Sequence, residues 1–360
     1  MLIAGEASGD LYGGCLAREI KKIREDISLF GMGGRLMEES GVEILFPISL
    51  DIVGALDALF KIPKAIFLLN NVLKVIRERK PDKVVLIDFA EFNLYLLKNL
   101  VNLKIKTAWL FPPTVWAWRK NRAKIVKKAD LILSTLPIER DFYKKEGVNV
   151  LFIGHPLLDI VRAEEQKSRR AEEGDNKKRP IISLLPGSRE GEIQRHLPVM
   201  VEVAKSLSDI ELFLILATGV KKEEIEKYIK GLNISIIPHS YNTIAQSDLL
   251  ITSSGTATLE GAILGIPMVV IYKMDRISFF LAKTFVKTKY VTLPNIIARE
   301  KIVPEFLQND ANPSNIAKEA LLILNDEKKR KEIKLKLSHI KDAIGPSGAI
   351  KRAANAIIEL

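Results

Sequence analysis

Residues 184–193 read LLPGSREGEI and join an apolar run to a charged helical pattern. The turn at residues 186–188 breaks the run, and Arg189 follows it directly. Glycine lets a backbone approach a ligand closely, the first N–H groups of a helix attract anions, and arginine adds a bidentate cation. The stretch therefore predicts a strand, a turn suited to a diphosphate and a helix that begins near Glu190. An ordinary turn with a surface arginine is the alternative.

Similar strand patterns lie on both sides of this turn. Short β-branched runs alternate with amphipathic helices, such as the one expected at residues 10–25, and this alternation is typical of parallel sheets with crossover helices. No sequence repeat of solenoid type is present. The predicted strands are residues 1–5, 83–89, 106–111, 129–135, 181–188, 211–217, 234–238, 248–255 and 267–272.

The chain length and one charged stretch predict two domains. A chain of 360 residues, 47% of them hydrophobic, exceeds what one core usually organises. Residues 163–180 lack an apolar period and are a linker by composition. We expect an α/β fold of two doubly wound parallel-sheet domains, residues 1–162 and 181–342, with the ligand site in the cleft between them. Residues 343–360 form a helix that either crosses back to the first domain or exchanges between subunits of a homodimer.

The formal net charge of +11 favours an anionic partner, which is nucleic acid, a negatively charged membrane or a phosphorylated small molecule. The basic residues are scattered and lack the aromatic spacing of a nucleic-acid platform, so no nucleic acid is expected. The one cysteine, Cys15, excludes an internal disulfide, and the histidines lack metal-ligand spacing. The chain opens directly in a strand, and we expect a cytoplasmic protein without a metal site.

A glycine-rich turn at residues 4–14, AGEASGDLYGG, follows the first strand. Its spacing departs from G-x-G-x-x-G, and the carboxylates of Glu6 and Asp10 would repel a pyrophosphate. Asp10 is placed to cap the following helix. This turn therefore predicts a different role from that of the turn before Arg189.

A turn of small residues at residues 253–262, SSGTATLEGA, ends a strand of the second half. Thr256 is placed to cap the next helix, and Glu260 lies one turn further on the same face. A carboxylate at that place suits the two vicinal hydroxyls of a ribose. Together with Arg189, the turn predicts a nucleotide diphosphate site.

The stretch at residues 52–76 is strongly apolar but is interrupted by charges and a proline, so it is too broken to span a bilayer. Basic flanks favour a segment that lies on an anionic membrane surface, and an ordinary core helix is the alternative. Residues 276–290 are a second candidate of the same kind. The side chains expected to contact membrane or acyl chains are Leu56, Leu59, Phe60, Ile66 and Phe67.

Several stretches, in order and across nearly the whole chain, resemble the lipid-A-disaccharide synthase family. They are AGEASGD (4–10), LIDFAEFN (86–93), PPTVWAWR (112–119), FIGHPLLD (152–159), LLPGSREGEI (184–193), SSGTATLE (253–260), KYVTLPNIIA (289–298) and PEFLQ (304–308). The resemblance implies a GT-B fold and an inverting glycosyl transfer without a metal or cofactor. It implies UDP-2,3-diacylglucosamine as donor and 2,3-diacylglucosamine 1-phosphate as acceptor, joined to a β-1,6 disaccharide with release of UDP on the inner face of a Gram-negative inner membrane.

The resemblance also implies roles for particular residues. Asp88, which ends an apolar strand, matches the general base for the acceptor hydroxyl. The donor and UDP contacts are expected at Gly187, Ser188, Arg189, Glu192, Ser254, Gly255, Thr256, Glu260, Asn295, Glu305 and Gln308. The acceptor and loop positions are expected at Glu6, Ser8, Gly9, Asp10, Asn93, Trp116, Trp118 and Arg119.

This chain departs from the family pattern after Asp88, where residues 89–91 lack the usual proline, and Glu91 competes with Asp88 for the role of base. Trp116 and Trp118 are expected on one face of a strand, either in the core or as a wall of the sugar and acyl site. Two other functions are weighed against the synthase: a UDP-sugar 2-epimerase-like enzyme of the same layout, and a non-enzymatic nucleotide- or RNA-binding protein.

Overall fold

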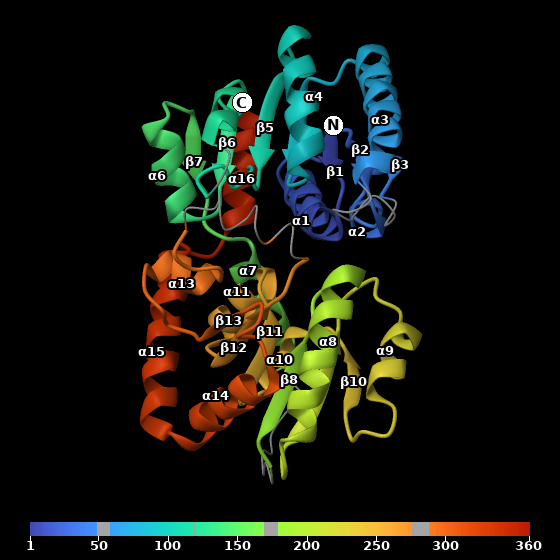
Figure 1. The fold of residues 1–360 in the computed structure, drawn as a ribbon. Coiled ribbons are helices and arrows are strands. Elements are labelled where there is room, and N and C mark those ends of the chain that lie inside the picture. Colours follow the sequence, from blue (N-terminus) through green and yellow to red (C-terminus); the bar gives the residue numbers. More distant parts are fainter. Residues whose placement is uncertain (49–57, 118–119, 169–178, 276–278, 280–287) are drawn as a thin grey trace. The chain divides into compact units, whose positions relative to one another are not determined.

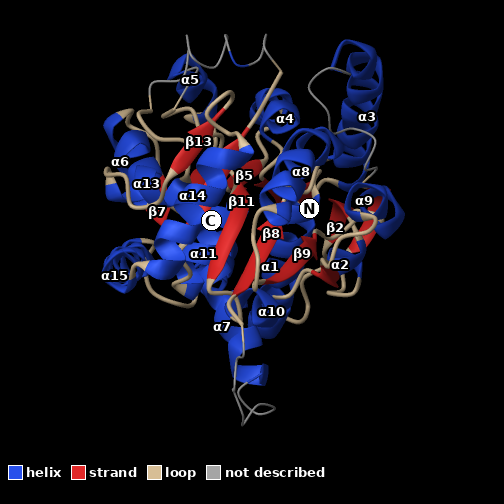
Figure 2. Cartoon of the chain, turned by 60° about the horizontal axis from the view of Figure 1, so that its bottom comes forward, coloured by secondary structure: helices blue, strands red, loops and turns tan. Residues whose placement is uncertain are grey.

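The computed structural model describes residues 1–48, 58–117, 120–168, 179–275, 279 and 288–360 (Figure 1). It divides into two compact units, Met1–Pro156 with Ile344–Leu360, and Leu157–Ala343. Each unit holds one sheet in which every strand pairing is parallel. Helices pack on both faces of each sheet (Figure 2). The predicted fold class, α/β with two doubly wound parallel sheets, is confirmed.

The first unit contains a seven-stranded sheet in the order β3-β2-β1-β4-β5-β6-β7. Its strands are β1 (Leu2–Ala4), β2 (Phe30–Gly33), β3 (Glu43–Pro47), β4 (Lys83–Ile87), β5 (Lys106–Leu110), β6 (Leu131–Ser134) and β7 (Val150–Phe152). Its helices are α1 (Ala7–Ile23), α2 (Arg35–Glu38), α3 (Ala58–Arg79), α4 (Ala90–Asn102), the 3-10 turn η2 (Lys120–Arg122), α5 (Ala123–Val126), α6 (Pro137–Lys145) and α16 (Ala349–Glu359).

The core of the first unit follows from the apolar runs of its central strands. Ile3 of β1, Leu86 of β4 and Trp109 of β5 are fully buried, as central strands of a parallel sheet require. α1 packs against α2 and α16 on one side, and α4 packs against α3 and α5 on the other. The strand order reverses between β1 and β4, so the loops that leave these two strands lie at the switch point on the carboxyl edge of the sheet, where ligands of such sheets usually bind.

The second unit contains a six-stranded sheet in the order β10-β9-β8-β11-β12-β13. Its strands are β8 (Ile181–Leu185), β9 (Glu211–Leu216), β10 (Ser235–Pro238), β11 (Leu249–Ser253), β12 (Met268–Tyr272) and β13 (Glu305–Leu307). Its helices are α7 (Leu157–Ser168), α8 (Glu190–Lys205), α9 (Lys222–Ile229), α10 (Tyr241–Ala245), α11 (Thr256–Leu264), α13 (Leu293–Ala298), α14 (Pro313–Asn325) and α15 (Glu327–Ala343). The order reverses between β8 and β11, which places the turns after these strands at the switch point on the carboxyl edge of the sheet.

Each strand expected from the sequence is present, but four short strands, β2, β3, β7 and β13, were not predicted. β2 reads FGMG and has no β-branched residue, so its strand conformation comes from pairing with β1 and β3. α7 continues to Ser168, past the residue at which the charged linker was expected to begin, and residues 169–178 lie outside the described residues. The C-terminal segment Ile344–Leu360 belongs to the first unit.

Candidate functional site

The switch point of the first unit holds Asp88 in an unusual backbone conformation. Asp88 and Phe89 both have positive φ angles, of 49° and 48°, and two adjacent residues in this region indicate a conformation that the surrounding fold imposes. Gly5 accommodates them, because a Cβ on Gly5 would lie 2.2 Å from the Phe89 ring. The Ser8 hydroxyl donates to Oδ2 of Asp88 at 3.2 Å. The loops after β1 and β4 therefore meet at the Asp88 carboxylate.

Asn93 supports the same loop from α4. Its Nδ2 donates to the main-chain carbonyl of Asp88 at 2.7 Å, and its side chain is fully buried. Among the described residues, Oδ1 of Asn93 has no hydrogen-bond partner. Glu91 has a different environment, because its exposed carboxylate forms two hydrogen bonds with Arg122, one of them 2.8 Å long. The two carboxylates considered for the role of base thus have different partners.

The sequence predicted that Asp10 caps its own helix, and this prediction is wrong. Glu6 is the N-cap residue of α1 and makes no side-chain cap hydrogen bond. The Asp10 carboxylate instead accepts from the backbone N–H groups at the start of α2, those of Gly34 (2.8 Å), Leu36 (3.0 Å) and Met37 (3.0 Å). Asp10 points to these groups because it lies inside α1, on the buried side that packs against α2.

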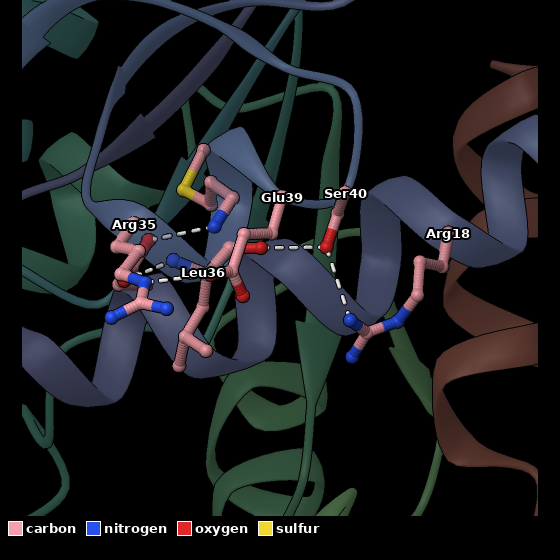
Figure 3. Close-up of polar contacts among 7 residues, drawn as sticks. Arg18, Arg35, Leu36, Glu39 and Ser40 are labelled. Carbon is pink, nitrogen blue, oxygen red and sulfur yellow. Dashed lines mark hydrogen bonds and ion pairs between the residues drawn. The ribbon is translucent and has the colours of Figure 1, made fainter.

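The contact between α1 and α2 continues beyond Asp10 (Figure 3). Ser40 donates to the carbonyl of Leu36 at 2.6 Å and accepts from Arg18 of α1 at 3.1 Å. Gly9 is buried in α1, where a Cβ would lie 3.1 Å from the Cβ of Ala4. Of the acceptor positions expected in residues 4–14, Gly9 and Asp10 therefore hold the fold of the loop, and Ser8 contacts Asp88.

Trp116 lies in a turn after β5 and not on a strand, so the expected strand pair of tryptophans is wrong for this residue. The strand ends at Leu110 because the consecutive prolines that follow have no N–H to donate to a sheet. Trp116 is buried. Trp118 and Arg119 lie outside the described residues.

Two buried side chains of α6 lie beneath this turn. The Tyr143 hydroxyl donates to the carbonyl of Pro113 at 2.7 Å. Glu139 accepts from the N–H groups of Thr135 and Leu136, each at 3.2 Å. Burial raises the pKa of Glu139 to about 7, although those two N–H groups oppose the rise.

An aromatic cluster closes the carboxyl edge near β5. The rings of Tyr12 and Phe111 lie 4.4 Å apart, and the Phe111 ring lies 5.5 Å from that of His155. Phe111 also has a positive φ, 56°. Burial lowers the pKa of His155 to about 3, so its ring is neutral and packs as an aromatic group.

The switch point of the second unit holds the turn before α8. Gly187 has a φ of 119°, and a Cβ there would lie 2.5 Å from Oε2 of Glu192. The Ser188 N–H donates to this Oε2 at 3.3 Å, and Nη1 of Arg189 lies 3.5 Å from Oε1 of Glu192. The turn therefore holds a carboxylate with one backbone N–H and one guanidinium, the same groups that bind a phosphate oxygen.

The turn after β11 faces the same edge. α11 begins at Thr256 with Gly255 as its N-cap residue and has no side-chain cap, so the expected cap by Thr256 is wrong. Gly255 takes the place before the helix because its φ of 156° and ψ of −157° suit glycine. The hydroxyl of Ser254 donates to the carbonyl of Val291 at 3.2 Å. This bond connects the small-residue turn to the segment before α13.

Glu260 lies in the second turn of α11 and is nearly buried. Its Oε2 lies 3.0 Å from Nε2 of His239, which directly follows β10. No role for His239 was predicted from the sequence. Its place after a predicted strand was the available signal, because the carboxyl ends of parallel strands gather at one edge.

Three further residues expected at the donor site form internal networks. Asn295 is fully buried, its Nδ2 donates to Val303 and Glu305, and its Oδ1 accepts from Ile302 and Val303, which satisfies the amide. Glu305 also accepts from the N–H groups of residues 291 and 292. Gln308 exchanges two hydrogen bonds with the backbone of Met274. These side chains hold the backbone segments at residues 274, 291–292 and 302–303 in place.

His196 of α8 connects two of these loops and was also missed. The N–H of Lys273 donates to its Nε2 at 3.0 Å, so Nδ1 carries the proton and donates to the carbonyl of Pro186 at 2.9 Å. Burial lowers the pKa of His196. The sequence signal for a buried role of His196 was its place on the apolar face of the predicted helix, which it shares with Ile193, Leu197 and Met200.

The described part of the apolar stretch exposes large side chains on α3. Ile66 is 52% exposed and Phe67 is 68% exposed. Nothing is described for Leu56 or for the side chains of Leu59 and Phe60, and most of the second candidate, residues 276–290, lies outside the described residues. Within the described ranges, no helix is both long and apolar enough to span a membrane. The same residues contain no group of His, Cys, Asp and Glu arranged to hold a metal ion.

Solved structures with the same architecture are known. UDP-GlcNAc 2-epimerase from Neisseria meningitidis, bound to UDP-GlcNAc, superposes with a TM-score of 0.66 at 13% identity and with 97% of each chain covered. The epimerase from Methanocaldococcus jannaschii, in complex with UDP-GlcNAc and UDP, gives a TM-score of 0.63 at 14% identity, with 98% of this chain and 97% of that chain covered. At these identities the likeness shows the fold, which is that of GT-B enzymes.

Sequence comparison is more specific. The lipid-A-disaccharide synthase of Nitrosococcus oceani is 38% identical over 369 residues, with 100% of this chain and 95% of the relative covered. That of Myxococcus xanthus is 35% identical over 370 residues, with 100% and 97% covered. The family model described as lipid-A-disaccharide synthetase matches residues 1–358. The match extends over both units and includes the loops at both switch points, so this chain belongs to the lipid-A-disaccharide synthetase family of hexosyltransferases.

Proposed function

We propose that the protein joins UDP-2,3-diacylglucosamine to 2,3-diacylglucosamine 1-phosphate, with inversion at the donor carbon, and releases UDP and a β-1,6-linked disaccharide 1-phosphate. The first unit holds the acceptor and the second holds the donor. The observation that carries the proposal is the Asp88 carboxylate, which lies at the switch point of a sheet and accepts a hydrogen bond from Ser8. Family membership along the whole chain agrees with it.

The Asp88 carboxylate is suited to the general base role. An alcohol is too weakly acidic to ionise beforehand at neutral pH, so its proton leaves as the new C–O bond forms. Asp88 accepts that proton while the acceptor oxygen attacks the anomeric carbon of the donor, and the bond from that carbon to the diphosphate breaks. Glu91 is occupied by Arg122. Asp88 is therefore the base that we propose for this chain.

The leaving diphosphate gains negative charge as the glycosidic bond breaks, and we assign its stabilisation to Arg189 and the N–H of Ser188. Both groups contact the Glu192 carboxylate in the structure. A diphosphate takes the place of that carboxylate, and Glu192 turns outward from α8. Glu260 receives the ribose hydroxyls, and the backbone near Gly255 lines the rest of the nucleotide.

The acyl chains of both substrates require an apolar surface, and α3 offers one. Ile66 and Phe67 are exposed beside Lys64, which is exposed as well. We propose that this part of α3 contacts an anionic membrane on its cytoplasmic side, where apolar side chains enter the interface and basic residues bind lipid headgroups.

One assay tests the proposed reaction. Purified protein is incubated with UDP-2,3-diacylglucosamine and 2,3-diacylglucosamine 1-phosphate, and the products are analysed by mass spectrometry. We expect a tetraacyl disaccharide 1-phosphate and an equal amount of UDP. A donor epimerised at C2 without disaccharide would indicate the epimerase-like alternative, which the family match does not favour. Binding of UDP without turnover would indicate a non-enzymatic protein.

A further inference from the structure

The hydrogen bond between His239 and Glu260 connects two parts of the second unit that the sequence keeps apart. His239 follows β10, at the edge of the sheet, whereas Glu260 lies in α11. Nε2 of His239 and Oε2 of Glu260 are 3.0 Å apart. The side chains are 25% and 12% exposed, so the pair is shielded from bulk water but is still accessible at the carboxyl edge.

The ring of His239 is oriented independently of Glu260. The backbone N–H of His239 donates to the carbonyl of Leu216, at the end of β9, at 3.0 Å. The ring also makes a T-shaped contact with Tyr241, with centroids 5.1 Å apart and planes at 85°. The ends of β9 and β10 and the start of α10 therefore determine where Nε2 lies.

A fixed donor at one carboxylate oxygen determines the direction of the other. The last torsion of a glutamate side chain is broad, so an isolated carboxylate rotates among many orientations. A hydrogen bond to a charged group is short and directional, and it restricts that rotation. With Oε2 held by His239, Oε1 has a defined direction before any ligand binds.

We propose that His239 is a positioning residue that orients the Glu260 carboxylate for the vicinal hydroxyls of a ribose, and thereby sets a preference for ribonucleotides over 2′-deoxyribonucleotides. The inference rests on the proposed function, in which Glu260 receives the ribose. A site arranged to bind a hydroxyl rejects an analogue that lacks it, because the polar group of the protein then loses its partner. Without His239, the carboxylate rotates freely and water replaces the missing hydroxyl at little cost.

The test compares the affinities for UDP and 2′-deoxy-UDP by isothermal titration calorimetry. For the wild-type protein we expect UDP to bind about tenfold more tightly, which is the contribution of one charge-assisted hydrogen bond. In His239→Ala the ratio falls below about threefold. In His239→Gln it stays near the wild-type ratio, because the side-chain amide can donate to Oε2 from a similar position.

Two further variants complete the test. His239→Asn keeps an amide but is too short to reach Oε2, so we expect it to behave like His239→Ala, and it replaces the alanine variant if that one does not fold. His339→Ala, at an exposed position of α15, is the matched control and should keep the wild-type ratio. A ratio unchanged in both loss variants overturns the positioning role.

The outcomes also separate this inference from the proposed function. If the wild-type protein binds UDP and 2′-deoxy-UDP equally, the ribose contact of Glu260 and the role of His239 both fail, while UDP binding stands. If the wild-type protein does not bind UDP, the proposed function itself is wrong. A loss of affinity for both nucleotides by the same factor in His239→Ala assigns a purely structural role to the ring.

Discussion

Asp88 and Glu91 stand three residues apart, and the structure gives their carboxylates different partners. Asp88 accepts from the Ser8 hydroxyl, whereas Glu91 forms two hydrogen bonds with Arg122. A base must be able to reach the acceptor proton, and a carboxylate held by a guanidinium on the surface is poorly suited to that task. The backbone at Asp88 and Phe89 lies in the left-handed region, a conformation that the surrounding fold must stabilise.

Replacing Asp88 tests this assignment. We expect Asp88→Asn to lower kcat by about 10² to 10⁴, the usual contribution of a general base, and to leave the affinity for UDP nearly unchanged. The asparagine can still accept from Ser8, so the loop is preserved. Steady-state kinetics and UDP titration measure the two quantities. Glu91→Gln is the control, and a loss of activity in that variant with full activity in Asp88→Asn would move the base to Glu91.

Replacing Arg189 tests the diphosphate contact. We expect Arg189→Ala to cost about 2 to 4 kcal/mol of transition-state stabilisation, measured as the change in kcat/KM, because the leaving UDP gains charge. Arg179→Ala is a matched control, since Arg179 is exposed and precedes β8 at its amino end. Equal activity of the two variants would leave Arg189 as a partner of Glu192 alone.

At the scale of the elements, α3 carries Phe67, which at 68% is the most exposed aromatic side chain among the described residues. Such a side chain on a helix with basic residues favours contact with an anionic surface. The packed face of the same helix contributes Val72 and Ile76 to the core of the first unit. One face of α3 is therefore core, while contact of its exposed side chains with a membrane stays a prediction.

Vesicle binding measures this property of α3. We expect wild-type protein to sediment with vesicles that contain anionic lipid at low salt and to be released in part at high salt, because screening weakens the attraction of lysines to headgroups. Ile66→Ser with Phe67→Ser should reduce the retained fraction severalfold. Leu335→Ser removes a side chain of similar exposure, 61%, from α15 and should have no effect. Equal losses in both variants would make the binding non-specific.

At the scale of the whole molecule, two buried groups of the first unit, Glu139 and His155, make contributions to the free energy of unfolding that change in opposite directions with pH. Burial raises the pKa of Glu139 from 4.5 to about 7, so its stabilising contribution is present at low pH and is lost as pH rises through about 7. Burial lowers the pKa of His155 from 6.5 to about 3, so its contribution is present above 6.5 and is lost as pH falls. Between pH 5 and 8 the two effects nearly cancel.

Variants separate the two effects. From pH 8 to pH 5, the wild-type protein should gain about 2 kcal/mol of unfolding free energy relative to Glu139→Gln and lose about 2 kcal/mol relative to His155→Gln. The three tryptophans of the sequence all fall within Met1–Pro156, the range of the first unit, so urea unfolding followed by tryptophan fluorescence reports on that unit. A difference that does not change with pH for one variant would show that the replaced group has an unshifted pKa, and a change of the opposite sign would show that its pKa is shifted in the other direction.

The sequence alone determined the two parallel sheets and the order of the loops that carry the motifs. The apolar runs of β4, β5, β8 and β11 are short and nearly continuous, as in strands buried on both faces, and they can be recognised without the rest of the chain. The turn before Arg189 was readable for the same reason, since glycine, a following helix and the cation are adjacent in the chain. The short strands β2 and β13 were missed because pairing with neighbours, and not their own residues, makes them strands.

Only the tertiary structure decided which side chains meet. Asp10 caps α2, more than twenty residues away, and not its own helix. His239 reaches Glu260 across 21 residues, and Ser8 reaches Asp88 across 80. Local sequence patterns determine the direction of a side chain within its own element, but the partner depends on how the elements pack. The partners of the Asp88 and Glu260 carboxylates could therefore be identified only in the folded chain.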